Sequence, residues 1–316
     1  MAKLISNVSP HFSGKRTTQN IMLDVIIALM PAAVASVIIF GLRALVVEVV
    51  CVATCVASEF LFEKLCKRDC TVFDLSAVVT GLLLAFNLPV SIPIWQAVIG
   101  SIAAIIVVKQ LFGGIGQNFA NPAITARIIM LVAFAGSMSN WSKPVDWSRS
   151  VYGADAVSGA TPLAAAAKGQ TEFMPDYLTL FLGHHGGCLG ETCALAIILG
   201  GLYLLVRGII SWHTPVAFIA TVALMSLICG KDVLYQLLSG GLLLGAFFMA
   251  TDYATTPSTK WGKIVFGIGC GLVTILIRFW GNLPEGVSYS ILLMNILTPY
   301  ISKLTQQKPL TGGVKV

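Results

Sequence analysis

Charged residues are scarce in this sequence. Only 11% of its 316 residues are Asp, Glu, Lys or Arg, and 56% are hydrophobic, whereas soluble domains carry about 25% charged residues. The low charge excludes an ordinary soluble domain and predicts an all-α polytopic membrane protein. The net charge of +6 requires no nucleic-acid partner, because Lys and Arg collect on the cytoplasmic face of membrane proteins.

Two further features are missing. Residues 1–19 are polar and lack the apolar run and small-residue cleavage site of a signal peptide, so we expect internal targeting signals. The eight cysteines form no C-x-x-C pair and no run typical of iron–sulfur clusters. His184 and His185 are adjacent, and neighbouring side chains point apart, so a loop anchor is favoured over a metal site. The pattern predicts no metal centre.

Ten apolar segments of roughly 16–22 residues are long enough to cross or nearly cross a bilayer. They lie near 21–41, 44–64, 74–90, 92–111, 121–139, 191–207, 214–230, 233–251, 262–279 and 286–302. The predicted organisation is a cytoplasmic N-terminal segment (1–20), a first repeat of five transmembrane helices (21–139), an extracytoplasmic loop (140–190), a second such repeat (191–302) and a cytoplasmic tail (303–316).

A weak internal echo suggests duplication. Gly81–Ala85 resembles Gly241–Gly245, and both halves have interruptions, at Asn87–Pro89 and Asp252–Pro257. Because each half has an odd number of spans, a second copy would be inverted, and inverted repeats place binding sites at the interface between halves. Chance similarity between Leu- and Gly-rich helices is the alternative.

Positive charge predicts the orientation. With both termini in the cytoplasm, most of the 20 Lys and Arg residues, Lys109 included, fall on the inner side. The long loop is then extracytoplasmic.

That loop contains a pattern typical of flavinylation signals, D-x-x-S-G-A-T. It consists of Asp155, Ser158, Gly159, Ala160 and Thr161. In proteins with this signal, the last threonine holds FMN through a phosphoester. Pro162 favours an extended Thr161 that presents its hydroxyl outward. The alternative is a helix start, with Thr161 as N-cap and Pro162 at the first helical position.

A glycine- and asparagine-rich segment, 113–123, precedes the fifth span. Asn121 before Pro122 is a credible N-cap. The amides of Asn118 and Asn121 beside a helix N-terminus also suit a polar or anionic ligand. No strand precedes the segment, so it is not a dinucleotide-binding fingerprint.

Acidic residues near the membrane are candidates for an ion path. Asp252 with Thr251 and Thr255 offers oxygen ligands for a small cation; a solvated loop is the alternative. Glu59 is the acid expected deepest in a span.

Taken together, these motifs resemble one family. They are G-G-x-G-x-N-x-x-N-P-A at 113–123, D-x-x-S-G-A-T at 155–161, G-E-T at 190–192, A-T-D at 250–252 and T-T-P at 255–257. The chain resembles, over almost its whole length, the family of the Rnf complex D subunit and the B subunit of the sodium-pumping NADH:quinone oxidoreductase.

The resemblance implies a bacterial inner-membrane subunit, not catalytic alone, of a complex that passes electrons between reduced ferredoxin and NAD⁺ and exports Na⁺ or H⁺. Its partners would be the C, G, E, A and B subunits of the Rnf complex. It also implies covalent FMN on Thr161, attached by a flavin transferase, riboflavin near Asn118 and Asn121, and a urea-transporter-like fold.

Two rival functions stay open. One is a flavin-free channel or small-solute transporter of the same fold. The other is the quinone-reductase subunit, although only about 20 residues precede the first span here, where that subunit has a longer region. Ser302 stands where quinone-reductase relatives have an acid, which argues against an ion site at that position.

Overall fold

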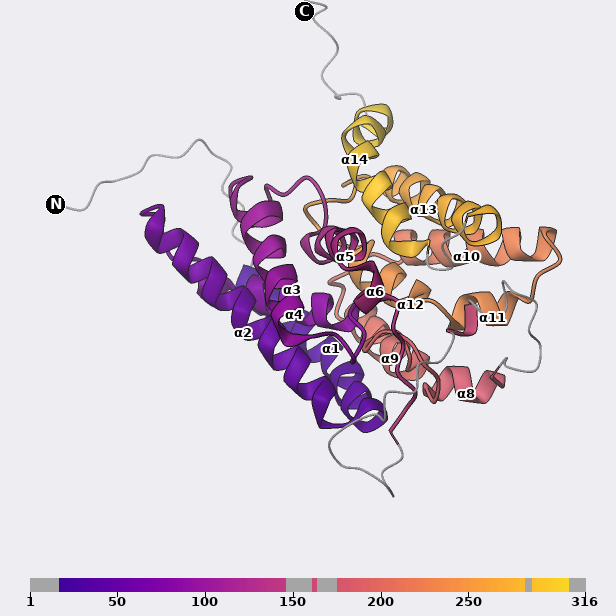
Figure 1. The fold of residues 1–316 in the computed structure, drawn as a ribbon. Coiled ribbons are helices and arrows are strands. Elements are labelled where there is room, and N and C mark those ends of the chain that lie inside the picture. Colours follow the sequence, from indigo (N-terminus) through magenta and orange to yellow (C-terminus); the bar gives the residue numbers. More distant parts are fainter. Residues whose placement is uncertain (1–16, 146–160, 164–174, 282–285, 307–316) are drawn as a thin grey trace, which may run out of the picture.

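A computed structural model describes residues 17–145, 161–163, 175–281 and 286–306 (Figure 1). These residues are helical and include no β-strand. Asp155, Ser158, Gly159 and Ala160 of the flavinylation pattern lie outside the described residues.

The first half of the chain contains α1 (Thr18–Phe40), α2 (Leu42–Leu65), the short 3₁₀ turn η1 (Val72–Asp74), α3 (Ser76–Phe86), α4 (Ile94–Ile102) continued by the π-helix η2 (Ala103–Gln110), α5 (Pro122–Ala133) and α6 (Ala135–Met138). The second half contains α8 (Tyr177–Leu182), α9 (Ala194–Val206), α10 (His213–Ile228), α11 (Val233–Leu238), α12 (Leu242–Leu244) continued by the π-helix η4 (Gly245–Met249), α13 (Lys260–Trp280) and α14 (Val287–Thr305). Each predicted apolar segment contains helix.

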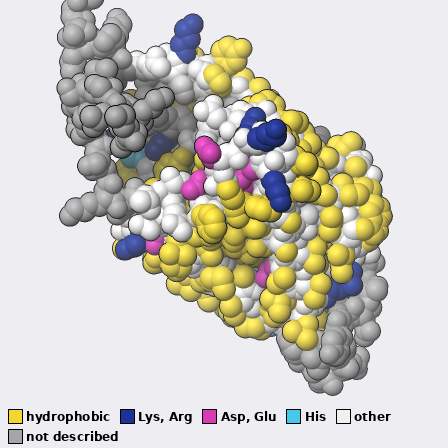
Figure 2. All heavy atoms as spheres, turned by 90° about the vertical axis from the view of Figure 1, so that its left-hand side faces the viewer, with side chains coloured by type: hydrophobic (Ala, Val, Ile, Leu, Met, Phe, Trp, Pro, Cys, Tyr) yellow, Lys and Arg dark blue, Asp and Glu magenta, His cyan; other side chains and the backbone are white. Residues whose placement is uncertain are grey.

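Three of the described helices, α1, α2 and α13, are long and apolar enough to cross a membrane by themselves. On α1 a stripe at helical spacing is exposed, formed by Leu23, Ile27, Met30, Val34 and Ile38. Figure 2 shows hydrophobic side chains over most of the described surface on the side of α1 and α2. Since water would not favour such a surface, the chain is a multi-pass membrane protein.

Several predicted spans are shorter than expected because the helix breaks inside them. In segment 74–90, α3 has 11 residues, follows Leu75 with φ 62°, and ends at Phe86, before Asn87. In segment 233–251, α11 ends before Gly240 and Gly241, both at positive φ. Segment 121–139 breaks at Phe134. The breaks after α3 and η4 fall at or close to the predicted interruptions.

The two halves lie side by side and contact each other through two helix pairs, α1 with α9 and α5 with α14 (Figure 1). Glycine allows the first contact. A Cβ atom on Gly200 would lie 2.0 Å from the carbonyl oxygen of Ala28, so no larger residue fits without moving α9 away from α1. Small residues at such crossings are how membrane helices pack closely.

Candidate cofactor and ion sites

A cavity of about 350 Å³ lies between α1, α3, α9 and the residues that follow η4. Its polar lining includes residues predicted separately from three sequence segments: Asn118 and Asn121, Thr251 and Asp252, and, in addition, Lys109. Its apolar walls include Ile21, Met22, Val79, Leu83, Leu204 and Phe248. Asn118, Asn121, Thr251 and Asp252 are therefore brought to one place, between the two halves.

Asn118 and Asn121 both line this cavity. Asn121 is the N-cap of α5, as predicted: its Oδ1 accepts hydrogen bonds from the backbone N–H groups of Ala123 (3.0 Å) and Ile124 (3.4 Å). Its Nδ2 donates to the carbonyl oxygen of Met249 at 3.5 Å, which ties α5 to the end of η4. Asn118 is buried and donates to the carbonyl oxygen of Ala120 at 3.0 Å.

The second half contributes Asp252 to the lining of the cavity. Its Oδ2 accepts from the hydroxyl of Thr255 at 3.1 Å, and its Oδ1 accepts from the backbone N–H of Ala254 at 3.4 Å. Thr251 also lines the cavity, but its hydroxyl donates to the carbonyl oxygen of Phe247 at 2.6 Å. Asp252 is therefore held by neutral donors from within three residues of itself.

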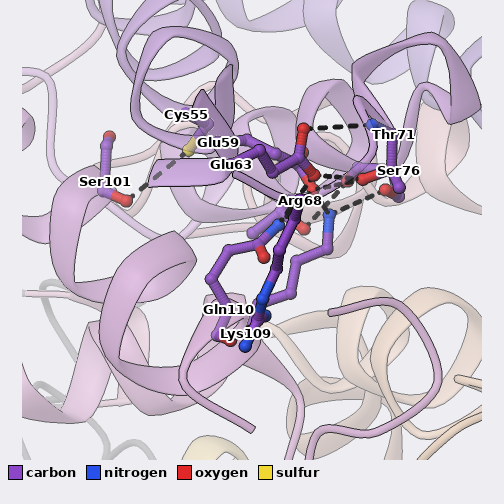
Figure 3. Close-up of polar contacts among 10 residues, drawn as sticks. Cys55, Glu59, Glu63, Arg68, Thr71, Ser76, Ser101, Lys109 and Gln110 are labelled. Atoms are coloured by element: carbon purple, nitrogen blue, oxygen red, sulfur yellow. Dashed lines mark hydrogen bonds and ion pairs between the residues drawn. The ribbon is translucent and has the colours of Figure 1, made fainter. Parts of the chain in front are cut away.

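Glu59 lies in a second cluster, beside the cavity rather than in its wall (Figure 3). It is fully buried, and its Oε1 accepts from Lys109 Nζ at 2.6 Å and from Gln110 Nε2 at 2.8 Å. Gln110 also reaches Glu63 at 3.3 Å, and Thr71 donates to Glu63 through both its backbone N–H (3.0 Å) and its hydroxyl. The cluster buries two carboxylates with one ammonium group.

The other carboxylate oxygen of Glu59, Oε2, is buried and has no hydrogen-bond partner among the described residues. An unpaired buried carboxylate oxygen is costly unless a proton, a cation or water satisfies it. Among the described residues every donor to Glu59 bonds to Oε1, so the hydrogen-bonding capacity of the second oxygen is unused.

From its sequence, Lys109 was expected only as one of the positive charges on the inner side of the membrane. It is in fact only 3% exposed. The π-helix η2 places the consecutive residues Lys109 and Gln110 on the same acid, Glu59 (Figure 3). An ionisable residue inside an apolar segment was the available signal. Lys109 also donates to Ser76 Oγ at 2.7 Å, and both residues line the cavity, so Lys109 joins the cavity to the Glu59 cluster.

Thr161 lies elsewhere, against the second half. It is 4% exposed, so the prediction of an outwardly displayed side chain is wrong in this structure. The reason is the docking of the next two residues. The Tyr235 hydroxyl donates to the carbonyl oxygen of Pro162 at 3.0 Å. Leu163 packs directly against Gly240: a Cβ atom on Gly240 would lie 2.1 Å from Leu163 Cδ1. Pro162 and Leu163 are helical, which agrees with the alternative of a helix start.

The elements that receive Thr161–Leu163 are themselves fixed by polar contacts. Arg278 near the end of α13 donates to the carbonyl oxygens of Gln236 (2.7 Å) and Ser239 (3.1 Å). Asp232 caps α11 by accepting from the Tyr235 N–H at 3.1 Å. The hydroxyl of Tyr177 also donates to Asp232 and holds the pKa of this carboxyl below its usual value. The docking surface is therefore built from α11 and the end of α13.

The G-E-T segment packs on the break after α3. The N–H of Gly190 donates to the carbonyl oxygen of Phe86 at 3.0 Å, and that of Leu189 to Leu88 at 3.1 Å. Glu191 accepts from the backbone N–H of Cys188 at 3.1 Å. This segment therefore satisfies backbone groups that the break leaves open.

The cavity suits a mostly apolar ligand with a few polar groups. A typical small-molecule site is mostly apolar with a few fixed polar groups and starts at about 300 Å³. Here apolar side chains form the walls, and amide, hydroxyl, ammonium and carboxylate groups lie at separate points of the lining. The residues present therefore fit a flavin held without a covalent bond.

Fold and cavity define the class: a helical, multi-pass membrane protein with a mostly apolar cavity that carries a few polar groups between its two halves, and a buried charge cluster beside it. The sequence matches the NQR2, RnfD, RnfE family over residues 5–311, and the chain belongs to that family.

Its relatives include the D subunit of the Na⁺-translocating ferredoxin:NAD⁺ oxidoreductase complex of Acetobacterium woodii, 49% identical over 95% of this chain and 93% of the relative. The D subunit of the proton-translocating ferredoxin:NAD⁺ oxidoreductase complex of Clostridium ljungdahlii is 41% identical over 94% and 93%. The D subunit of an ion-translocating oxidoreductase complex of Stutzerimonas stutzeri is 37% identical over 93% and 92%.

Proposed function

We propose that this chain is the D subunit of an Rnf complex, an ion-translocating ferredoxin:NAD⁺ oxidoreductase of the bacterial inner membrane. The observation that carries the proposal is the near full-length similarity to subunits with that name. The C, G, E, A and B subunits would be its partners, and it would catalyse nothing without them. The names of the two relatives differ in the ion, so the coupling ion is Na⁺ or H⁺.

The subunit would carry two flavins. FMN would be attached to Thr161 by a separate flavin transferase, within the pattern Asp155 to Thr161. Riboflavin would occupy the cavity beside Asn118 and Asn121, where apolar side chains would contact its ring system and the amides and Lys109 offer hydrogen-bond donors. Flavins supply one- and two-electron transfer, while the protein sets their position and potential. Since Thr161 is buried here, attachment requires that this segment open to the transferase.

The fold would be two inverted repeats of five transmembrane helices, urea-transporter-like, covering 21–139 and 191–302. The pairing of α1 with α9 and of α5 with α14 supports a two-fold relation between the halves, as do the breaks after α3 and η4. Segments 1–20 and 303–316 would be cytoplasmic, and loop 140–190, with Thr161, extracytoplasmic. Cysteine labelling of intact cells at introduced sites in these segments tests this topology.

An ion path would use Glu59 with Asp252, Thr251 and Thr255. Oε2 of Glu59, which has no hydrogen-bond partner among the described residues, supports the binding of a proton or cation at this residue. The oxygen atoms of Asp252 and Thr255 support a second binding point on the path.

The assay of the assembled complex in inverted membrane vesicles tests the function. We expect NAD⁺ reduction by reduced ferredoxin, with ²²Na⁺ uptake or acidification, and loss of both when this subunit is deleted. Electron transfer to quinone in place of NAD⁺ would favour the quinone-reductase subunit. Solute flux with no bound flavin would favour a channel.

A further inference from the structure

Lys109 is shared between two sites. Its ammonium group contacts Glu59 and Ser76, while its side chain lines the cavity on the other side. Among the described lining residues of the cavity, only Lys109 and Asp252 carry charge. Lys109 is therefore the positive charge available to an anion or electron-rich ring in the cavity, and at the same time the positive charge that neutralises Glu59.

We propose that Lys109 is a positioning residue that couples charge in the cavity to cation binding at Glu59. When the occupant of the cavity gains negative charge, the ammonium group moves toward it and leaves Glu59. The released carboxylate then binds one cation, Na⁺ or a proton. This proposal rests on the proposed function, because it requires a redox-active occupant in the cavity.

The composition of the cluster suits the exchange of the Lys109 ammonium group for a cation. The cluster sets the two carboxyl groups of Glu59 and Glu63 against the single ammonium of Lys109, and one oxygen of Glu59 has no hydrogen-bond partner in the part of the chain that the structure describes. Gln110 is neutral, and the exposed Arg68 donates to the backbone carbonyl oxygen of Gln110 at 3.1 Å rather than to either acid. Withdrawal of Lys109 would leave the acids without a neutralising partner within the cluster, so cation uptake restores the balance of charge.

The side chain is also suited to move. A lysine has a compact charge on a flexible stem of four carbons, and its donors rotate freely. Ser76, at the start of α3, accepts from the ammonium group and lines the cavity, so it provides a contact from which Lys109 can reach either side. The electron comes from reduced ferredoxin and the cation from water, and no covalent bond forms or breaks.

The test is the midpoint potential of the non-covalent flavin in the purified complex, titrated with Na⁺ and, separately, with pH. In the wild type the potential should rise as the concentration of one of the two cations rises. The expected slope is about 59 mV per tenfold increase in that concentration, for one electron and one cation. Lys109→Met should keep the flavin but lose this dependence, while Lys109→Arg should keep both. Lys64→Met is the matched control, because Lys64 is exposed on α2, and it should behave as the wild type.

The outcomes separate the claims. If the wild type releases no non-covalent flavin on denaturation, the proposed occupant of the cavity is wrong. If flavin is present and Lys109→Met keeps the cation dependence of the wild type, the role of Lys109 is wrong. If Lys109→Met fails to assemble, the Ser76→Ala variant provides the test. Its flavin potential should rise, because the ammonium group is held less firmly beside Glu59. An unchanged potential would overturn the proposal.

Discussion

The cavity and the Thr161 segment differ in how the chain builds them. The cavity is formed jointly by the two halves, with Lys109 and Asn118 from the first and Asp252 from the second. Pro162 and Leu163, which follow Thr161, contact Tyr235 and Gly240 of the second half, and Arg278 donates to the carbonyl oxygen of Gly240. Asp252 precedes α13, which starts at Lys260. Arg278 is near the other end of this helix, about 27 Å from Lys260 along the helix axis. A non-covalent ligand needs an enclosed cavity, whereas a tethered one needs only a held attachment point.

Thr161→Ala should give the largest effect and separate the two regions completely. It removes the hydroxyl that a phosphoester requires, so in-gel flavin fluorescence of the subunit should disappear. Non-covalent flavin released by denaturation should stay, because the cavity is far from this residue. Thr179→Ala on α8 is the control and should keep its fluorescence; fluorescent Thr161→Ala protein would refute the covalent site.

Val79→Trp should have the opposite effect. Val79 lines the cavity, and the indole would occupy space that a ring system needs. Non-covalent flavin should fall at least tenfold, while FMN on Thr161 is kept. Val78→Trp is a matched control, because Val78 faces an apolar groove between α1, α2 and α3. Equal flavin loss in both variants would contradict the cavity assignment.

Glu59 and Asp252 should differ in their contribution to stability. Glu59→Leu leaves the buried Lys109 without its charged partner, which costs about 3–5 kcal/mol. Asp252→Asn keeps an acceptor for the neutral donors Thr255 and Ala254 and should cost less than about 1.5 kcal/mol. Thermal melting of the purified complex should rank the variants in this order, and Glu59→Leu combined with Lys109→Met should recover part of the loss. An equal drop for the two single variants would be evidence against the buried pair.

Tyr235→Phe should have the smallest effect. It removes one hydrogen bond to Pro162, worth about 0.5–1.5 kcal/mol. The Thr161 segment would open more often, so flavin attachment by the transferase in vitro should become faster while its final extent is unchanged. Tyr203→Phe, which removes a hydroxyl contact with Asp24, should leave the rate unchanged. A slower reaction in Tyr235→Phe would mean that docking assists attachment.

Much of the fold could be predicted because apolar length and helix-start chemistry are local. The bounds of α1, α2 and α13 and the N-cap at Asn121 follow from a few neighbouring residues. The sequence similarity between Gly81–Ala85 and Gly241–Gly245 was a weaker guide to the structure. Gly81 packs within α3 against the backbone of α2, while Gly241 precedes α12 at positive φ, so the two glycines have different roles.

The site residues were partly predictable for the same reason. Asn118, Asn121, Thr251 and Asp252 stood out as polar groups at helix ends, and the structure places them in one cavity. The pairing of Glu59 with Lys109 could not be predicted, because the two residues are 50 positions apart and because no local sequence pattern indicated the π-helix η2. The docking of the two residues after Thr161 depends on Tyr235 and Gly240, which lie far along the chain in the second half.

The most direct test of the account is mass spectrometry of the peptide spanning residues 150–168, taken from the mature complex. We expect the mass of one FMN joined through its phosphate to Thr161. A peptide of unmodified mass, or FMN on a different residue, would contradict the claim that this membrane subunit carries a tethered flavin.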